Sequence, residues 1–219
     1  MSAPSSVQAA VEFFFDCNCP WSYLALGRLR EAAIRTGAKI IYRPVLLAEI
    51  VGKGVSHSGT VQGELAAARR RYQQKDLQDW ARFCGVELQH PDIGPIDTEW
   101  AQRGAVVAQQ AGVLAAYLEL LYRVRFAEGR DIGKLAEITA AAQSAGLSGE
   151  AFESALRAPE TLVELRRNAA SLLDHGGFGT PTMLVGADLY YGNDRMPLVE
   201  IALARAGGMR LVMPGEHGS

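Results

Sequence analysis

The hydrophobic pattern of the first 45 residues predicts one strand–helix–strand unit. Residues 11–15 (VEFFF) form a short, mostly aromatic run, typical of a buried strand, that ends at Asp16. From Pro20 onward apolar residues recur at helical spacing, and proline suits the first helical position because its missing N–H is not needed there. A second apolar run, AKIIYRPVLL, follows Thr36-Gly37. This order matches one right-handed β-α-β unit.

The middle of the chain is expected to be helical. No convincing strand pattern occurs between residues 61 and 173, whereas several segments there show helical periodicity and end at Gly or Pro. The expected helices cover residues 70–83, 98–110, 113–126, 132–145 and 159–173.

The last part of the chain returns to strands. Residues 183–185 and 189–191 form two short strands around the turn Gly186-Ala187-Asp188, and residues 196–206 form a closing helix. The order β-α-β, helical insertion, β-β-α predicts an α/β protein with a thioredoxin-like fold interrupted by an all-helical domain. We assign residues 1–44 and 174–219 to the thioredoxin-like domain and residues 45–173 to the helical insertion domain.

Composition and charge narrow the classes of function. The chain has 219 residues, 48% of them hydrophobic, and its 22 Lys and Arg against 24 Asp and Glu give a net charge of -2. No global positive field attracts phosphate backbones, so nucleic acid is not an expected partner. The apolar runs fall far short of the roughly 20 residues needed to cross a bilayer. Because the start also lacks a basic region before its apolar stretch, we expect a cytoplasmic protein with no membrane partner.

Cysteine and histidine usage favours a working thiol over a disulfide framework or a metal site. Three cysteines are an odd, small number for a secreted framework. The histidines have no i, i+4 pair and no cysteine at ligand spacing, so we expect no metal. They are His57, His90, His175 and His217.

Cys19 falls at the predicted N-cap of the first helix. Unpaired backbone N–H groups and the positive end of the helix dipole favour thiolate there, so we expect its pKa below the usual value of about 8.5. The alternative is a small buried apolar residue, which free cysteines often are. Cys17 and Cys84 are most simply packing residues, and a disulfide between Cys17 and Cys19 would span only two residues, which is tight for bridge geometry.

The motif Cys19-Pro20-Trp21-Ser22 limits the redox chemistry. Disulfide exchange normally uses a second thiol to resolve the mixed disulfide, and Ser22 cannot do so. An efficient dithiol oxidoreductase is therefore disfavoured. A single thiol can still hold a mixed disulfide or add reversibly to a conjugated, electron-poor double bond.

Five stretches together resemble a known family over nearly the whole chain. They are FFFDCNCPWSYLA, YRPVLL, RRYQQKDLQDWARFCGV, GFGTPTMLV and YYGNDR. The family is the glutathione-linked branch of the DsbA-like thioredoxin superfamily, which contains 2-hydroxychromene-2-carboxylate isomerases and kappa-class glutathione transferases. Its members usually have Ser, whose hydroxyl faces the thiol of bound glutathione, where this chain has Cys19. They commonly have Asn where this chain has Asp97 and Thr98, so substrate recognition is expected to differ.

The resemblance also implies a binding site for glutathione and a homodimer. It implies that Pro181 is cis and that the backbone of Thr180 pairs with an extended thiol ligand. The alternative is that Pro181 is a trans residue that opens an edge strand. The family's tripeptide is gripped by the loop that matches Arg43 and Pro44, and its γ-glutamyl end by the stretch that matches Asn193, Asp194 and Arg195. The alternatives are that Asp194 only caps the last helix and that Arg43 is an exposed strand-end residue.

Three classes of function follow from these residues. The first is a thiol-dependent isomerase of carbon–carbon double bonds, cis-trans or hydroxychromene-type, acting on a small-molecule or carrier-bound conjugated substrate. Its expected catalytic residues are Cys19, Ser22 and Tyr23; Cys19 is the nucleophile, and no glutathione is needed if Cys19 supplies the thiolate. The second class is a glutathione transferase or monothiol disulfide oxidoreductase, and the third a binding module without catalysis. In each enzyme class we expect Cys19, Pro181 and Asp194 to converge on one cleft between the two domains.

Overall fold

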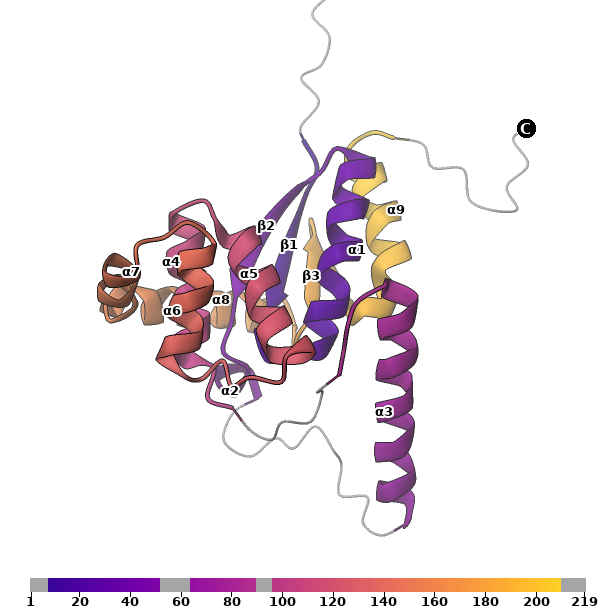
Figure 1. Ribbon diagram of the computed structural model, residues 1–219. Helices are drawn as coiled ribbons and strands as arrows, with labels where there is room; N and C mark the ends of the chain where they lie inside the picture. Colours follow the sequence, from indigo (N-terminus) through magenta and orange to yellow (C-terminus); the bar gives the residue numbers. More distant parts are fainter. Residues whose placement is uncertain (1–7, 52–63, 90–95, 210–219) are drawn as a thin grey trace, which may run out of the picture.

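The computed structural model describes residues 8–51, 64–89 and 96–209 (Figure 1). Its sheet has the strand order β2-β1-β3-β4. The strands are β1 (Ala10–Phe15), β2 (Lys39–Pro44), β3 (Thr182–Val185) and β4 (Asp188–Tyr191). β1 pairs in parallel with β2 and antiparallel with β3, which continues antiparallel into β4. The two predicted strand pairs are therefore confirmed, and they join through β1.

Helix α1 (Pro20–Thr36) packs beside the closing helix α9 (Met196–Ala206) (Figure 1). Cys19 is the N-cap of α1 in an extended conformation, and Pro20 occupies the first helical position. The helix ends at Gly37, whose φ of 64° is left-handed and lets its N–H reach the carbonyls of Ala33 and Ile34. Both ends of α1 therefore follow from residues that are visible in the sequence.

The insertion is helical in the described residues, as predicted. Helices α4 to α8 gather beside the sheet, where α4 and α8 contact β2, whereas α3 lies apart from them against α1 (Figure 1). The sequence pattern missed the short helices α2 and α7, because each is too short for a periodicity of 3.6 residues to stand out. The helices are α2 (Leu47–Val51), α3 (Glu64–Cys84), α4 (Glu99–Gln110), α5 (Leu114–Tyr122), the π-helix η1 (Arg123–Ala127), α6 (Leu135–Ser144), α7 (Gly149–Leu156) and α8 (Pro159–Asp174).

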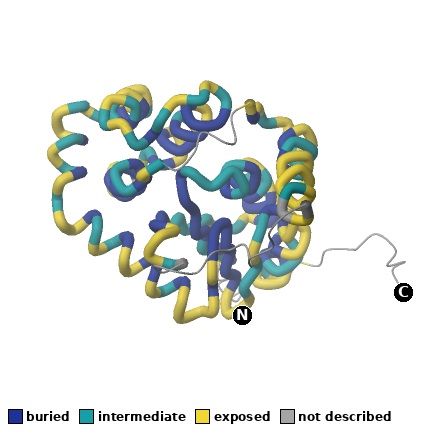
Figure 2. The backbone as a smooth tube through the Cα atoms, turned by 90° about the horizontal axis from the view of Figure 1, so that it is seen from below, coloured by how far each residue is buried: buried dark blue, intermediate teal, exposed yellow. Residues whose placement is uncertain are grey.

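One continuous hydrophobic cluster joins the sheet to the insertion. Phe13 and Phe15 on β1 are fully buried and belong to the same cluster as Leu24 on α1 and Tyr117 and Tyr122 on α5. The buried stretches of the chain meet in the interior in Figure 2. The two sequence-assigned domains therefore share a core. None of the helices in the described ranges is long and apolar enough to cross a membrane.

Gln102 on α4 ties the insertion to the ends of two strands. Its buried Nε2 donates to the carbonyl oxygens of Phe15 (3.0 Å) and Val45 (2.5 Å). Its Oε1 accepts a hydrogen bond from the Sγ of Cys17 at 3.1 Å. A buried polar group is costly unless paired, so this one amide satisfies three groups at once.

We expect Gln102→Leu to lower the free energy of unfolding by about 2–4 kcal/mol, because the Val45 carbonyl loses its donor and the Cys17 thiol its acceptor, whereas the Phe15 carbonyl keeps only the N–H of Val45. Gln109→Leu is the matched control: Gln109 is also on α4 and donates to a strand carbonyl, that of Tyr42, but it is exposed. The control should change stability by no more than about 0.5 kcal/mol. Urea unfolding measures both, and equal losses in the two variants would contradict the role given to Gln102.

Candidate functional site

The N-terminus of α1 meets the segment before β3 at Cys19. The Sγ of Cys19 donates a hydrogen bond to the carbonyl oxygen of Thr180 at 3.3 Å, across 161 positions of sequence. The peptide bond between Thr180 and Pro181 is cis. The thiol is half-buried and thus lies at the junction of the β1–α1 turn and the cis-proline segment.

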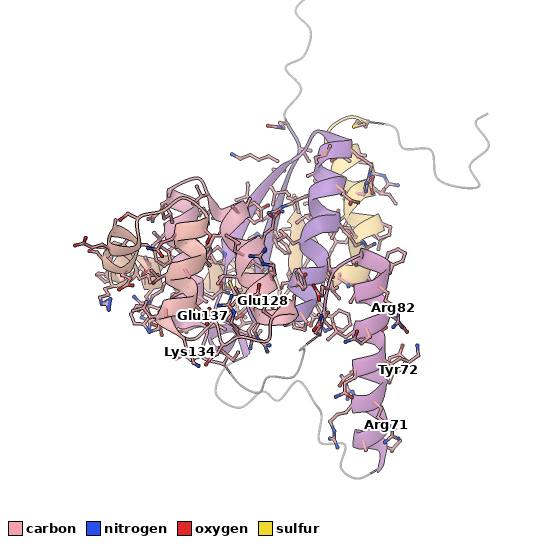
Figure 3. All side chains as sticks on the ribbon, viewed as in Figure 1. Arg71, Tyr72, Arg82, Glu128, Lys134 and Glu137 are labelled. Carbon is pink, nitrogen blue, oxygen red and sulfur yellow. The ribbon has the colours of Figure 1, made fainter. Side chains whose placement is uncertain are left out.

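Two cavities flank this junction. The first, which we call the cis-proline cavity, has a volume of about 510 Å³ and lies between α3 and the segment after β4. It is lined by Trp21 on α1, by Tyr72, Asp76 and Trp80 on α3, by Thr180 and Pro181, and by residues 191–195. Tyr72 lies about midway along α3 in Figure 3.

The second cavity, which we call the Cys19 cavity, has a volume of about 440 Å³. It lies between the β1–α1 turn, the start of α2 and the residues before α4. Its walls are Asp16, Asn18, Cys19, Pro20, Leu46, Leu47, Ala48, Ile96, Asp97 and Thr98.

The structure divides the single cleft that we expected. Pro181 and Asp194 line the cis-proline cavity, whereas Cys19 lines the other cavity. The hydrogen bond from Cys19 to Thr180, a wall residue of the cis-proline cavity, connects the two. A ligand on either side of this bond would therefore be close to the sulfur.

The expected low pKa of Cys19 is wrong. Burial raises the pKa of this thiol above its usual value, because the thiolate would lose solvent, and the charge of Asp16 raises it further. Interactions with Ser22 and Thr180 act in the opposite direction but do not offset the loss of solvent. The position at a helix N-terminus is as predicted; the desolvation that outweighs it depends on packing that the sequence does not reveal.

Three buried polar atoms near this junction have no hydrogen-bond partner within the described ranges. They are Ser22 Oγ, Thr180 Oγ1 and Asn193 Nδ2. Ser22 is fully buried, and its hydroxyl makes no well-formed hydrogen bond, yet it faces the Cys19 sulfur closely enough to lower the pKa of that thiol. Thr180 and Asn193 line the cis-proline cavity. Because unpaired buried groups are rare and cost about 1–3 kcal/mol each, their clustering points to a place where a polar ligand binds.

The segment 193–195 lines the cis-proline cavity as a unit. Arg195 pairs with Asp194 at 3.3 Å, and the backbone oxygen of Asn193 accepts from Arg28 at 2.7 Å. Asp194 does not cap the last helix, since α9 has no side-chain cap hydrogen bond. The alternative that Asp194 serves only as a cap of α9 is therefore not what the structure shows.

Tyr23 points away from the thiol. Its hydroxyl donates to the backbone oxygen of Glu87 at 3.3 Å, and its ring stacks on Phe126 with 5.5 Å between the ring centres. Burial and the charge of Glu87 raise the pKa of Tyr23. Tyr23 is not among the described residues that line either cavity, so the structure does not bring it to Cys19.

Arg43 and Pro44 are also held elsewhere. Arg43 forms an ion pair with Glu12 on the neighbouring strand at 2.7 Å. Pro44 is buried, and its carbonyl oxygen accepts a hydrogen bond from Asn168 on α8 at 3.0 Å. Neither belongs to the described walls of the two cavities.

Asp16, Asn18 and Asp76 belong to the cavity walls although the sequence pattern did not single them out. Asp16 precedes the two cysteines of DCNC and Asn18 lies between them, at a strand–helix junction, and that position was a usable signal. Asp76 lies on a helix rich in charged residues, so nothing in the sequence distinguished it from its neighbours. Across the described residues, no group of three or more His, Cys, Asp or Glu is arranged to hold a metal ion.

Comparisons with known proteins agree with this geometry over most of the chain. The family model described as the DSBA-like thioredoxin domain matches residues 10–204. A 2-hydroxychromene-2-carboxylate isomerase of Sphingobium xenophagum is 28% identical over 190 residues, which cover 87% of this chain and 95% of the relative. The enzyme of the same name from Pseudomonas putida is 28% identical over 197 residues, 89% of this chain and 94% of the relative. A solved structure of a 2-hydroxychromene-2-carboxylate isomerase aligns with a TM-score of 0.77 and 26% identity, over 90% of this chain and 95% of that chain. The predicted thioredoxin-like fold with its helical insertion is confirmed.

We expect alkylation of Cys19 by iodoacetamide to become about tenfold faster per pH unit up to about pH 9, because only the thiolate reacts and the raised pKa keeps it scarce at neutral pH. A Cys84→Ala variant simplifies the assay, since Cys17 is fully buried. Peptide mass spectrometry follows the rate. A plateau below about pH 8 would show that the thiol ionises more easily than its burial implies.

Proposed function

This chain belongs to the DSBA-like thioredoxin domain family, and we propose that it is a thiol-dependent isomerase of carbon–carbon double bonds, cis-trans or hydroxychromene-type. The names of the curated relatives support an isomerase on this fold. The observation that carries the proposal is the position of Cys19, a half-buried thiol at the N-cap of α1 that lines a cavity of about 440 Å³. Its substrate is a conjugated compound bound in the Cys19 cavity.

In the proposed reaction the sulfur of Cys19 adds to the β-carbon of an alkene conjugated to a carbonyl group. The π electrons move onto the carbonyl oxygen, which takes up the thiol proton by way of solvent and becomes an enol. The former double bond is now single and rotates freely. The enol then loses that proton, the double bond re-forms in the other geometry, and the departing sulfur is reprotonated. No electrons are gained or lost, and Cys19 is regenerated.

The surroundings of the thiol suit addition followed by elimination. The raised pKa of Cys19 keeps the resting sulfur protonated, with the carbonyl oxygen of Thr180 as its acceptor. The hydroxyl of Ser22 faces the sulfur and makes no well-formed hydrogen bond in the described structure, so it can donate to the departing thiolate. Ser22 then stabilises the leaving sulfur, and Cys19 is held in place by the fold without a second thiol substrate.

The cis-proline cavity fits the thiol tripeptide glutathione that the family resemblance implies. Its volume of about 510 Å³ is within the usual range for small-molecule sites. Thr180 Oγ1 and Asn193 Nδ2 offer unpaired polar atoms on its wall. Asp194 and Arg195 would hold the amino and carboxylate groups of the γ-glutamyl end. When bound there, glutathione would supply a second thiol.

The cis-proline cavity favours one alternative, a glutathione transferase or monothiol disulfide oxidoreductase. Cys19 would then hold a mixed disulfide with the tripeptide, and Ser22 would offer no second thiol to resolve it. The two functions differ in which molecule reacts with the sulfur of Cys19: a conjugated substrate in the Cys19 cavity for the isomerase, and glutathione in the cis-proline cavity for the alternative.

We expect Cys19→Ser and Cys19→Ala to lose turnover of a conjugated ketone by at least about a thousandfold in buffer free of thiols, because the attacking atom is gone. The wild type should turn over without added glutathione. Cys84→Ser is the matched control, since Cys84 is a partly exposed thiol outside both cavities and its removal should leave kcat/KM unchanged. Ultraviolet absorbance of the conjugated system measures each rate.

The opposite pattern would favour glutathione as the source of sulfur. If Cys19→Ser stays active and its rate depends on added glutathione, the attacking sulfur is not that of Cys19. Reduction of a glutathione mixed disulfide by the wild type, with no isomerisation of any conjugated ketone, would support the oxidoreductase instead.

A further inference from the structure

The polar part of the Cys19 cavity carries acidic side chains and no basic ones among its described wall residues. The acidic residues are Asp16 and Asp97, accompanied by the uncharged polar residues Asn18 and Thr98. The remaining wall is apolar, formed mainly by the leucines at the start of α2 and by Ile96. A bound molecule therefore meets apolar surface and negative charge.

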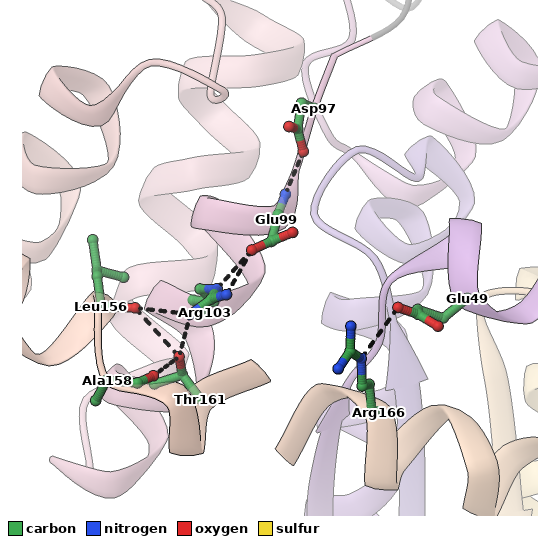
Figure 4. Close-up of polar contacts among 8 residues, drawn as sticks. All are labelled: Glu49, Asp97, Glu99, Arg103, Leu156, Ala158, Thr161 and Arg166. Atoms are coloured by element: carbon green, nitrogen blue, oxygen red, sulfur yellow. Dashed lines mark hydrogen bonds and ion pairs between the residues drawn. The ribbon is translucent and has the colours of Figure 1, made fainter. Parts of the chain in front are cut away.

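The two aspartates are fixed in position. Asp16 is buried, and its oxygens accept hydrogen bonds from the N–H groups of Asn18 (2.7 Å) and Leu47 (3.2 Å). Asp97 is exposed at the start of α4, where its Oδ1 accepts from the N–H of Glu99 at 3.0 Å (Figure 4). Asp97 therefore stays at the cavity rather than turning away from it.

The arginines that approach this region do not supply a positive wall. Arg103 lies between Glu99, with which it pairs at 2.7 Å, and Thr161 (Figure 4), and it is not among the described wall residues of the cavity. Arg125 is buried and donates to the Oδ1 of Asn18 at 2.5 Å, but it is not itself among the described wall residues. An anion in the cavity would face Asp97 without a neutralising partner on the described wall.

We propose that the Cys19 cavity selects conjugated substrates that carry no carboxylate, such as enones, esters or thioesters, and that Asp97 is the residue that discriminates against carboxylates. This inference rests on the proposed function, because it takes Cys19 as the attacking sulfur. This selectivity would separate the chain from its relatives, whose names specify a 2-carboxylate substrate. A hydroxyl on the substrate would find acceptors in Asp97 and Thr98.

Charge repulsion sets the size of the expected effect. A carboxylate within several ångströms of Asp97 is opposed by a like charge that solvent screens only in part, which amounts to about a tenfold loss in kcat/KM. Added salt should weaken this discrimination, because the aspartate is exposed.

The test compares an α,β-unsaturated ketone that ends in a carboxylate with the methyl ester of the same compound. Each kcat/KM is divided by the rate of addition of 2-mercaptoethanol to that compound, which removes the difference in intrinsic reactivity. We expect the wild type to prefer the ester by at least about tenfold and the preference to shrink as ionic strength rises.

Asp97→Asn keeps an oxygen that can accept from Glu99 and removes only the charge. It should raise the ratio of kcat/KM for the acid to kcat/KM for the ester by about tenfold. Asp188→Asn, an exposed aspartate on β4 outside this cavity, is the matched control and should change neither.

Two failures can be told apart. If Cys19-dependent turnover is present but the wild type accepts acid and ester equally at all salt concentrations, the inference is wrong and the proposed function stands. If neither compound is isomerised in a Cys19-dependent manner, both are wrong. The wild-type comparison needs no variant, so it decides the matter even if Asp97→Asn fails to fold.

Discussion

The buried amide of Gln102 is the constraint on which the arrangement of the site depends. It holds the last carbonyl of β1 and the carbonyl that follows β2, and its own oxygen accepts the thiol of Cys17. Gln102 lies four residues after Thr98, whose backbone oxygen accepts from the Gln102 N–H at 2.9 Å. The same residue therefore sets the positions of the β1–α1 turn and of the start of α4. These are two walls of the Cys19 cavity, so the cavity is built across both parts of the chain and is not a feature of either alone.

In the proposed reaction, burial is what would let one thiol serve as both nucleophile and leaving group. A helix N-terminus alone would keep Cys19 ionised, whereas removal from solvent keeps it protonated against the carbonyl oxygen of Thr180. A sulfur of higher pKa is intrinsically the stronger nucleophile once it is deprotonated. In the proposed reaction the departing thiolate needs a hydrogen-bond donor, and the hydroxyl of Ser22, which faces the sulfur, would supply it.

Much of the fold could be predicted from the sequence because its signals are local. Pro20 and Gly37 mark the ends of α1, and the alternation of apolar and turn residues around Gly186 defines the hairpin. The site was less predictable because its properties depend on contacts between distant segments. Nothing near Arg43 in the sequence shows that Glu12 on the next strand neutralises it, and nothing near Tyr23 shows that it stacks on Phe126. The division into two cavities likewise depends on where α2 and the residues before α4 come to lie.

The most direct test of the central claim is to trap the sulfur–carbon bond itself. The wild type, in thiol-free buffer, is mixed with a conjugated ketone, quenched in acid within one turnover, digested and analysed by mass spectrometry. The account predicts a mass increase of one substrate molecule that fragmentation of the shared peptide assigns to Cys19 and not to Cys17, no increase on the peptide of Cys84, and loss of the adduct on longer incubation as the isomerised product appears. Isomerised product with no adduct on Cys19 at any time, or product only when glutathione is added, would contradict it.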